Sequence, residues 1–488
     1  MPLVPLSRRD FLAVSTAGAA LATMPALAAV TPTSPNGRIR LGFIGVGGRA
    51  HNHLDSACHL YRNSQSVEIA SVCDVFNRNR DRAVAKVRDA IGHEPQATGD
   101  YRDILRDPSI DAVVISTPDH WHARQTLDAL AAGKHVYCEK PMTHTIDEAL
   151  AVFQAWEDSG LVMQVGVQST SLPVWHAINQ RIIGGGLGKI LQYQTEFFRN
   201  SDCGQWRYYE LSQDMTPKNI DWSMFLGTEF GLAPEMPFDR AIFGQWRCYL
   251  PFGSGVFTDL FVHRTTSMLA ATGLRFPGRV VGAGGIFLEY DGRDVPDVAT
   301  VVADFPEGVQ GLVTATMCCG ETPIKQLIRG HFGSVVLGTG EEFSGYDFVA
   351  ERPQVTRDRS YRDERVEVGQ VENTSLAHFG NFIDAVRAGD PHAVNCTPEL
   401  GAAAMTIVKL GANSYREGKV YHFDRDTMTY SDGNDAWAKK WETMSRDRAK
   451  PLHVPGWHAG DTGSLLQPRN YQQLAGPWVD GVDPAAKS

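Results

Sequence analysis

The spacing of hydrophobic and polar positions changes near residue 168, and the two halves of the chain predict two kinds of sheet. From about residue 38 to residue 164, short runs of β-branched residues alternate with amphipathic stretches that suit helices. This alternation is typical of a parallel sheet covered by helices on both faces. We therefore predict a doubly wound α/β domain over residues 38–165, with strands at 39–44, 67–74, 112–116, 135–138 and 162–165.

Beyond residue 168 the expected strands are longer and alternate between polar and apolar positions. They lie at 190–198, 279–290, 299–305 and 309–317, with helices at 174–183, 259–272, 375–387 and 398–417. Such alternation suits an open, mostly antiparallel sheet with helices on one face. We predict a second α/β domain over residues 166–420, and we assign no role to the tail at 421–488, which is rich in Trp, Pro, Gly and Asp.

The first 29 residues read as an export signal of the twin-arginine type. Arg8 and Arg9 precede an uncharged stretch over 11–24, and Ala26-Leu27-Ala28 offers a small-residue cleavage site. The apolar stretch is shorter than the roughly 20 residues that a membrane span requires. We expect export to the periplasm or beyond, and no membrane anchor after cleavage. Because this route carries folded proteins, a cofactor would travel with the chain and stay bound outside the cytoplasm.

Composition narrows the range of partners. The chain holds 46 Lys and Arg against 56 Asp and Glu, a formal net charge of −10, which does not favour nucleic acid. Its eight cysteines are scattered, and none stands in a Cys-x-x-Cys spacing that would suggest a metal or a redox pair. We predict neither a nucleic-acid partner nor a metal.

The segment from Gly42 to Ala50 reads as a strand that runs into a glycine-rich turn and then into a helix. In such a unit Gly45 permits the tight turn, and Gly47 lets the backbone approach a pyrophosphate at the helix N-terminus. Gly48 and Arg49 add open backbone and a cation. The glycine spacing alone is a weak signal. The expected strands before and after it, at 39–44 and 67–74, complete a dinucleotide-binding unit.

Asp74 stands at the end of the second expected strand, 29 residues after Gly45. Its carboxylate can accept hydrogen bonds from a ribose 2′-hydroxyl, and it would repel a 2′-phosphate. This position favours NAD as the cofactor. Arg78 and Arg80 are close enough in sequence to keep NADP open as an alternative.

Two more motifs follow strand ends at the edge where open α/β sheets bind their ligands. Thr117, Pro118 and His120 are expected beside the cofactor. Glu139 and Lys140 precede a proline that raises the chance of a cis peptide bond. Lys140 can hold a substrate hydroxyl and help to move its proton. The alternative is that Lys140 only ends the strand in solvent.

Asp259 and His263 are four residues apart, which places them on one face of a helix. The imidazole could accept a hydroxyl proton while the carboxylate orients it, although a surface or capping contact explains most such pairs. Six aromatic residues of the second domain could stack on a sugar, with core packing as the alternative; they are Trp175, Trp206, Tyr208, Tyr209, Trp222 and Trp246.

Taken in order, these motifs resemble the Gfo/Idh/MocA group of nicotinamide oxidoreductases, which includes glucose-fructose oxidoreductase and inositol dehydrogenase. The resemblance rests on segments 45–50, 73–75, 117–122, 139–141, 188–190 and 259–263, and it covers about residues 38–420. It implies a Rossmann domain, a second domain whose open sheet often mediates homo-oligomer formation, and a site between them. Lys140 would bind and polarise the reacting hydroxyl, His263 would be the general base, and Asp259 would orient the site.

Departures from the group concern the substrate pocket. Phe261 and Arg264 stand where many relatives have a glycine and an aspartate. We predict an exported oxidoreductase that keeps NAD(H) bound and acts on a sugar, a polyol or a sugar derivative. A redox-assisted glycoside hydrolase is the first alternative, although the similar hydrolases that can be compared tend to depart from the Glu-Lys-Pro retained here. A non-catalytic sugar-binding protein is the second.

Overall fold

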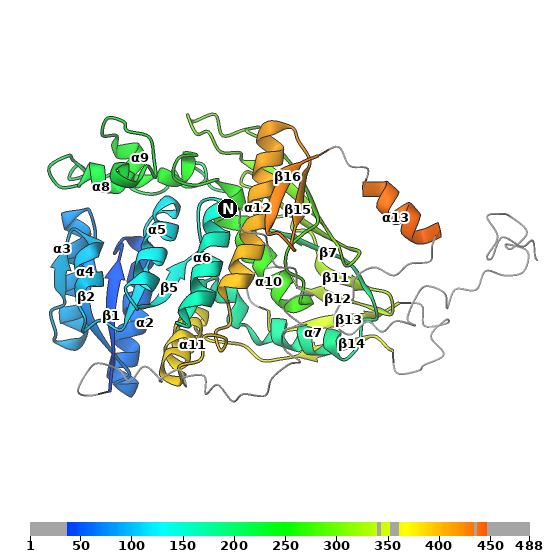
Figure 1. Cartoon of the computed structure of the whole chain (residues 1–488), viewed down its shortest axis with the longest axis horizontal. Helices are drawn as coiled ribbons and strands as arrows, with labels where there is room; N and C mark the ends of the chain where they lie inside the picture. The colour runs from blue at the N-terminus through cyan, green and yellow to red at the C-terminus, as the bar shows by residue number, and fades with distance from the viewer. Residues whose placement is uncertain (1–36, 339–342, 352–360, 434–436, 447–488) are drawn as a thin grey trace, which may run out of the picture.

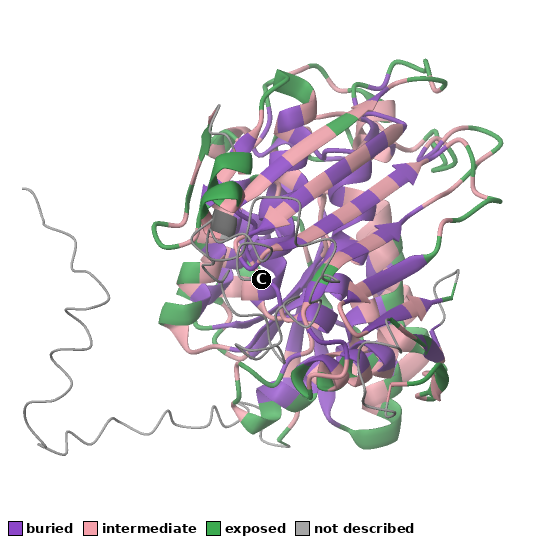
Figure 2. Cartoon of the chain, turned by 90° about the vertical axis from the view of Figure 1, so that its right-hand side faces the viewer, coloured by how far each residue is buried: buried purple, intermediate pink, exposed green. Residues whose placement is uncertain are grey.

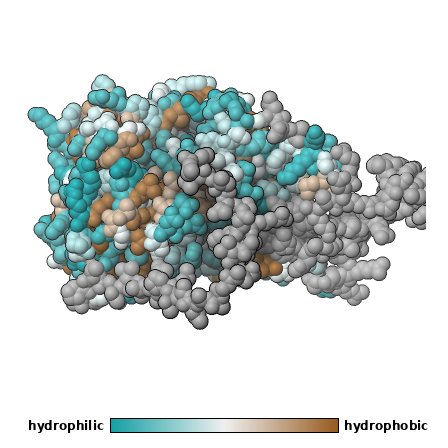
Figure 3. All heavy atoms as spheres, viewed as in Figure 1, coloured by the Kyte–Doolittle hydropathy of each residue, from teal (hydrophilic) through white to brown (hydrophobic). Residues whose placement is uncertain are grey.

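The computed structural model describes residues 37–338, 343–351, 361–433 and 437–446. The predicted signal over residues 1–29 and the end of the tail from residue 447 lie outside these residues. Two sheets stand side by side, with helices between and around them (Figure 1). Hydrophilic side chains cover most of the described surface in the view of Figure 3, with smaller hydrophobic areas over the first sheet's half. Within the described residues, no helix combines the length and apolar character needed to cross a membrane.

The first sheet is parallel and has six strands in the order β3-β2-β1-β4-β5-β6. The strands are β1 (Ile39–Ile44), β2 (Val67–Cys73), β3 (Gln96–Thr98), β4 (Ala112–Ile115), β5 (His135–Glu139) and β6 (Met163–Gly166). Five of them were predicted; β3 was not, because its three residues are largely exposed and carry no hydrophobic run. The chain reverses its direction of winding between β1 and β4, and ligands bind at such switch points.

Helices cover both faces of this sheet, as the sequence predicted. They are α2 (Gly48–Ser64), α3 (Asn77–Ile91), α4 (Tyr101–Arg106), α5 (Asp119–Ala131) and α6 (Ile146–Ser159). The capping box of Thr145 and Glu148 opens α6. A helix from much later in the chain, α11 (Thr374–Ala388), also packs here: Phe379 and Phe382 contact the ring of Tyr137. The first domain therefore includes a helix that sequence order placed in the second.

The second sheet has ten strands in the order β14-β13-β12-β11-β7-β10-β9-β8-β15-β16. They are β7 (Ile190–Glu196), β8 (Arg279–Gly285), β9 (Val298–Phe305), β10 (Val309–Thr316), β11 (Gln326–Gly330), β12 (Gly333–Leu337), β13 (Gly345–Ala350), β14 (Glu364–Glu367), β15 (Tyr421–Asp424) and β16 (Thr429–Asp432). Among the described strands of this sheet, only β7 and β10 pair in parallel, so the predicted mostly antiparallel sheet is confirmed. β15 and β16 use residues that the sequence analysis left in the tail.

The alternation that predicted this sheet is visible as buried and half-buried residues along its strands (Figure 2). The buried face packs on α7 (Pro173–Ile183), α10 (Val262–Thr272) and α12 (Pro398–Glu417). Helix α12 approaches β8 so closely that a Cβ atom at Gly282 would collide with the carbonyl of Gly411. Beyond β16 the last described helix is α13 (Trp437–Arg446).

A long excursion between β7 and α10 reaches back over the first sheet. We call residues 199–253 the roof segment; it contains α8 (Trp222–Leu226) and α9 (Arg240–Gly244), which lie above the helices of the first domain in Figure 1. The amide of Asp221 donates to the Val75 carbonyl at 3.0 Å, and the amide of Asn77 donates to the Asn219 carbonyl at 3.0 Å. The roof segment is thus joined to the loop that follows β2.

Candidate cofactor and active site

A cavity of about 970 Å³ lies between the two sheets and below the roof segment. It runs from the glycine turn after β1 to the side chains of Lys140 and His263. Its size and its position at the switch point of a parallel sheet suit a large ligand. The lining includes nine of the ten residues that the sequence analysis placed at the cofactor: Gly45, Gly47, Gly48, Arg49, Asp74, Thr117, Pro118, Glu139 and Lys140.

The glycine turn has the shape that a pyrophosphate requires. Gly45 has a φ of +79°, and a Cβ there would lie 2.8 Å from the amide nitrogen of Thr117. Gly47 and Gly48 instead face open space, with the nearest heavy atom to a Cβ at Gly47 3.8 Å away. Helix α2 begins at Gly48, so its free amides point toward the cavity. The residues present fit a dinucleotide at this end.

Asp74 braces the glycine turn from the end of β2. Its carboxylate accepts hydrogen bonds from the amides of Val46 and Phe76, both at 2.9 Å, and from the side chain of Asn79 at 3.2 Å. Burial raises the pKa of this carboxyl, and these hydrogen bonds oppose the shift. An oxygen with one partner keeps acceptor capacity, so Asp74 can still receive a ribose hydroxyl.

The two arginines that kept NADP open are engaged by protein groups. Arg78 pairs with Asp214 of the roof segment at 2.9 Å. Arg80 donates to the backbone carbonyl of Asp74 and to the side chain of Asn77, and it does not line the cavity. Because Asp214 already balances the charge of Arg78, and the Asp74 carboxylate would repel a 2′-phosphate, the site favours NAD.

The motif after β4 divides between the cavity and the core. Thr117 and Pro118 line the cavity, and Pro118 precedes the first turn of α5. His120, predicted beside the cofactor, is buried away from the cavity, and its Nε2 binds the carbonyl of Phe225 at 2.8 Å. Burial lowers its pKa to about 4. The prediction for His120 therefore has to be corrected: the residue supports the roof segment rather than facing the cofactor.

Glu139 is the centre of a buried network beside the cavity. One carboxylate oxygen receives the Nε–H of Arg49 at 2.8 Å, lies 2.7 Å from Nε2 of His53, and receives the side-chain amide of Gln168 at 2.9 Å. Burial opposes ionisation of Glu139, but the charge of Arg49 and the contact with His53 hold its pKa well below the usual range. This network fixes Arg49 at the cavity wall.

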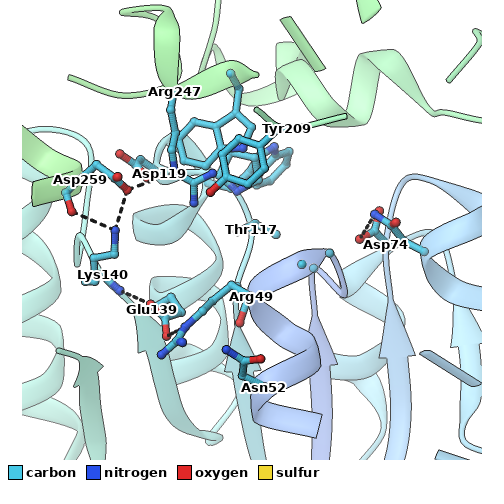
Figure 4. A pocket seen from close by; sticks show the side chains of 18 of the residues that line it. Arg49, Asn52, Asp74, Thr117, Asp119, Glu139, Lys140, Tyr209, Arg247 and Asp259 are labelled. Atoms are coloured by element: carbon cyan, nitrogen blue, oxygen red, sulfur yellow. Dashed lines mark hydrogen bonds and ion pairs between the residues drawn. The ribbon is translucent and has the colours of Figure 1, made fainter. Parts of the chain in front are cut away.

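Lys140 points into the cavity rather than into solvent. Its Nζ donates to the Asp259 carboxylate at 2.7 Å and to the Asp259 backbone carbonyl at 3.1 Å (Figure 4). The peptide bond to Pro141 is cis. The same carboxylate accepts the Nε–H of Arg247 at 3.1 Å and the indole N–H of Trp206 at 2.9 Å. Burial would raise the pKa of Asp259, but Lys140 and Arg247 lower it far below its usual range.

His263 lines the cavity but does not bind Asp259. The residues 257–261 form a π-helical turn before α10, so the spacing of four does not follow an ordinary α-helical face. Its ring lies 5.9 Å from the ring of Phe197 and has no hydrogen-bond partner among the residues that the structure describes. Burial and the charge of Lys140 lower its pKa to about 3. The expected carboxylate–imidazole contact is absent, and the neutral ring faces the cavity.

The six aromatic residues considered for sugar stacking have different positions. Tyr209 and Trp246 line the cavity, whereas Trp206 is buried against Asp259. Trp175 packs against Phe343 in the core of the second domain. Trp222 stacks on Phe225 inside the roof segment, and Tyr208 lies beside Tyr209 without lining the cavity.

Two charged residues beside Lys140 and Asp259 were missed by the sequence analysis. Asp119, next to the predicted Pro118, is 4% exposed and lines the cavity near Lys140. Arg247 comes from the roof segment and follows a tryptophan that had been noted only as an aromatic. For Asp119 the signal was its place within the motif after β4. For Arg247 there was none, because its approach to Asp259 depends on the course of the roof segment.

The raised pKa of Asp119 should make the stability of the protein depend on pH. Burial raises its pKa to about 7, against the opposing charges of Lys140 and Arg247. The folded state therefore holds a proton that the unfolded chain releases near pH 4, and stability falls as the pH rises from about 4 to about 7. We expect Asp119→Asn to remove this slope and to gain at most about 4 kcal/mol on the wild type between pH 4 and pH 8. Urea unfolding of the wild type and the variant at pH 4 and at pH 8 measures this gain. An equal difference in unfolding free energy at both pH values would refute the raised pKa of Asp119.

Comparison with known proteins identifies the first domain. Residues 39–167 match the Gfo/Idh/MocA family model, described as an oxidoreductase family with an NAD-binding Rossmann fold. The N-terminal domain is thus an NAD-binding Rossmann domain. Levoglucosan dehydrogenase in complex with NADH and levoglucosan has a similar fold, with a TM-score of 0.58 at 20% identity over 82% of this chain and 100% of that chain. The UDP-N-acetylglucosamine 3-dehydrogenase of Acidithiobacillus ferrooxidans gives 0.54 at 19% identity, over 78% and 98%.

Curated relatives match a smaller part of the chain. A glycosyl hydrolase family 109 protein of Shewanella sp. (strain W3-18-1) is 33% identical over 184 residues, which cover 35% of this chain and 39% of the relative. An alpha-N-acetylgalactosaminidase of Shewanella oneidensis is 30% identical over 188 residues, with the same coverage of 35% and 39%. The matched part of the chain thus spans less than half the length of these two relatives.

Proposed function

We propose that this protein is an oxidoreductase that keeps one NAD(H) bound and transfers a hydride between it and a hydroxyl or carbonyl group of a sugar, a polyol or a sugar derivative. The observation that carries this proposal is the position of Lys140, fixed by Asp259 in the same cavity as the glycine turn. Bound NAD would supply the hydride acceptor. The protein's own side chains have to bind the substrate, orient it and move its proton.

Lys140 is arranged to bind the reacting oxygen. An ammonium group has three N–H donors, and two of them are directed to Asp259. The third is available to a substrate hydroxyl, and the positive charge stabilises negative charge that develops on that oxygen. Asp259, itself held by Arg247 and Trp206, acts as a positioning residue for the lysine.

Oxidation of a CH–OH group releases a hydride and a proton, so the site needs a proton acceptor. His263 faces the cavity as a neutral imidazole, which can accept the proton, but its pKa of about 3 makes it a weak base. The ionised form of Asp119, with a pKa of about 7, is a stronger acceptor at the same end of the cavity. Reduction of a carbonyl group uses the same groups in reverse.

Retention of the nucleotide follows from the roof segment. Phe225, Phe243 and Met215 line the cavity from above. The roof segment is tied to the first domain at the loop after β2, and by an ion pair between Arg102 and Glu229 at 3.0 Å. A nucleotide below this cover could leave only if these contacts opened. This supports a cofactor that is recycled in place, as export by the twin-arginine route would require.

We expect Phe225→Ala to loosen the roof segment and release the nucleotide. The Phe225 ring is 3% exposed and lies 5.0 Å from the rings of Trp222 and Phe243. Removing such a ring costs about 3–5 kcal/mol, and much of that loss would fall on local opening of this segment. Nucleotide retained through gel filtration should drop from about one per chain to less than half, measured by chromatography after denaturation.

A matched control is Phe423→Ala, on β15 away from the cavity. Phe423 is 5% exposed and stacks on Phe276 at 5.2 Å, so the loss of packing is similar. This variant should be less stable but should keep its nucleotide. If both variants retained NAD equally, the roof segment would not be what holds it.

A redox-assisted glycoside hydrolase is the second candidate, and the relatives named as family 109 hydrolases and as an alpha-N-acetylgalactosaminidase favour it. In this reaction a sugar hydroxyl is oxidised, the aglycone is eliminated, water adds, and the carbonyl is reduced again by the same nucleotide. Lys140 and the proton acceptors would serve that sequence equally well. The two functions differ in the net redox change.

One experiment distinguishes the oxidoreductase from the redox-assisted hydrolase. The released nucleotide is identified first, and the holoprotein is then incubated with polyols and with chromogenic N-acetylgalactosaminides. Reduction of bound NAD by a polyol, reversed by an added carbonyl compound, supports the oxidoreductase. Release of the chromophore without net NADH change supports the hydrolase, and inactivity in both assays counts in favour of a non-catalytic relative. Export and homo-oligomer formation stay predictions, to be checked by cell fractionation and by light scattering.

A further inference from the structure

Arg247 adds a second cation beside Lys140 at the substrate end of the cavity. It lies in the short turn from Trp246 to Cys248 of the roof segment and lines the cavity. Its Nε–H donates to the same Asp259 oxygen that accepts from Lys140, at 3.1 Å against 2.7 Å (Figure 4). The nitrogens of the two cations are therefore no more than about 6 Å apart.

The guanidinium group of Arg247 is held as a rigid fork. Its Cζ lies 4.2 Å from the ring centroid of Trp246 and 5.4 Å from that of Tyr209, and Nε is fixed by Asp259. Among the residues that the structure describes, neither terminal nitrogen has a hydrogen-bond partner, and the side chain is 23% exposed. Two parallel N–H donors held in this way match the two oxygens of a carboxylate.

The charges around the fork leave a positive surplus. Lys140 and Arg247 are balanced by Asp259, while burial keeps Asp119 protonated below about pH 7. Arg199 and Arg264 line the same end of the cavity, both with other partners, and the exposed Glu210 is the acid at its rim. This positive surplus suits an anionic group, and a carboxylate matches the planar pair of donors at Arg247.

We propose that the substrate is a sugar acid whose carboxylate binds the two terminal nitrogens of Arg247 while Lys140 binds the hydroxyl that is oxidised. The inference rests on the proposed function, since it assigns the substrate class of that site. Because the two cations share one oxygen of Asp259, the oxidised carbon lies within a few bonds of the carboxylate. The carboxylate takes no part in the redox step: bound NAD would accept the hydride, and the proton would go to His263, because Asp119 already holds a proton in this charge state.

The test uses matched pairs that differ only in the carboxylate. These are D-galacturonate with D-galactose, D-glucuronate with D-glucose, and D-gluconate with D-glucitol, titrated calorimetrically into the holoprotein and assayed for reduction of bound NAD. In at least one pair the acid should bind about tenfold or more tightly, and its apparent affinity should fall as NaCl is raised. Equal binding within every pair, no binding by any acid, or tighter binding of a hexose 6-phosphate would overturn the inference.

Variants test the role of Arg247 itself. Arg247→Gln should abolish the preference for the acid, and Arg247→Lys, which keeps the charge but loses the fork, should keep only part of it. Arg365→Gln on β14 makes the same change of charge far from the cavity and should leave the preference intact. If Arg247→Gln lowered the affinity for acid and neutral sugar in parallel, Arg247 would only position Asp259.

Binding and turnover separate this inference from the proposed function. If the acids bind through Arg247 and neither they nor the neutral sugars and polyols reduce the bound nucleotide, the oxidoreductase is refuted and the binding site still stands. Neutral sugars that reduce bound NAD as fast as their acids would support the oxidoreductase and refute the substrate class.

Discussion

Lys140→Met is expected to lower the rate of hydride transfer by about 10³-fold or more while one NAD(H) per chain stays bound. The variant removes the N–H donor and the positive charge at the reacting oxygen. It leaves the glycine turn and the roof segment unchanged, so the nucleotide keeps its contacts. Single-turnover reduction of bound NAD measures the rate, and chromatography of the denatured protein measures the nucleotide.

Two further variants make this result specific. Lys86→Met removes a half-exposed lysine that pairs with Asp55 on the outside of the first domain, and it should leave the rate within about twofold. Lys140→Arg keeps the charge but changes the geometry, so it should restore only part of the rate. A Lys140→Met protein within tenfold of the wild type would show that Lys140 does not touch the reacting group.

Asp259→Asn is expected to cost about 3–5 kcal/mol of unfolding free energy, in addition to activity. The change leaves Lys140 and Arg247, 13% and 23% exposed, beside each other without the carboxylate that both bind. Because the pKa of Asp259 is depressed in the folded state, its contribution is complete above the unfolded pKa of about 4 and is lost as the pH falls below it. The deficit of the variant should therefore shrink below pH 4.

Urea unfolding at pH 7 and at pH 3 measures this deficit. The matched control is Asp304→Asn, which breaks the pair with Arg279 on the half-exposed face of β9 and β8 and should cost less than about 1 kcal/mol. A similar cost for both variants, or no change of the Asp259→Asn deficit with pH, would mean that the three-way contact is not held as an ionised cluster.

Much of the first domain could be predicted because its signals are local. Periodicity located five of the six strands, and the glycine spacing located the turn. In the second sheet, alternation along single strands located β7, β8, β9 and β10, but not β11 to β16. The sequence analysis nevertheless placed α11 with the wrong neighbours, because the order of elements along the chain does not reveal which sheet a late helix covers.

The candidate site was predicted only in part, for a physical reason. Lys140 and Asp259 were identified as separate motifs, but their contact spans 119 residues of sequence and depends on how the two sheets pack. Asp259 and His263 were expected to touch because of their spacing, and a π-helical turn prevents it. His120 was expected at the cofactor, and its burial beneath Phe225 placed it in the core instead.

The sequence by itself determined most strands of the first sheet, the central strands of the second, the NAD-binding turn and the residue types available for chemistry. Backbone conformation and amphipathic spacing depend on residues a few positions apart, so they can be read along the chain. Tertiary structure alone decided which charges share a carboxylate, that burial raises the pKa of Asp119, and that the roof segment brings Arg247 over the cavity. These properties arise from desolvation and from side chains that meet only after packing, and no short-range pattern encodes them.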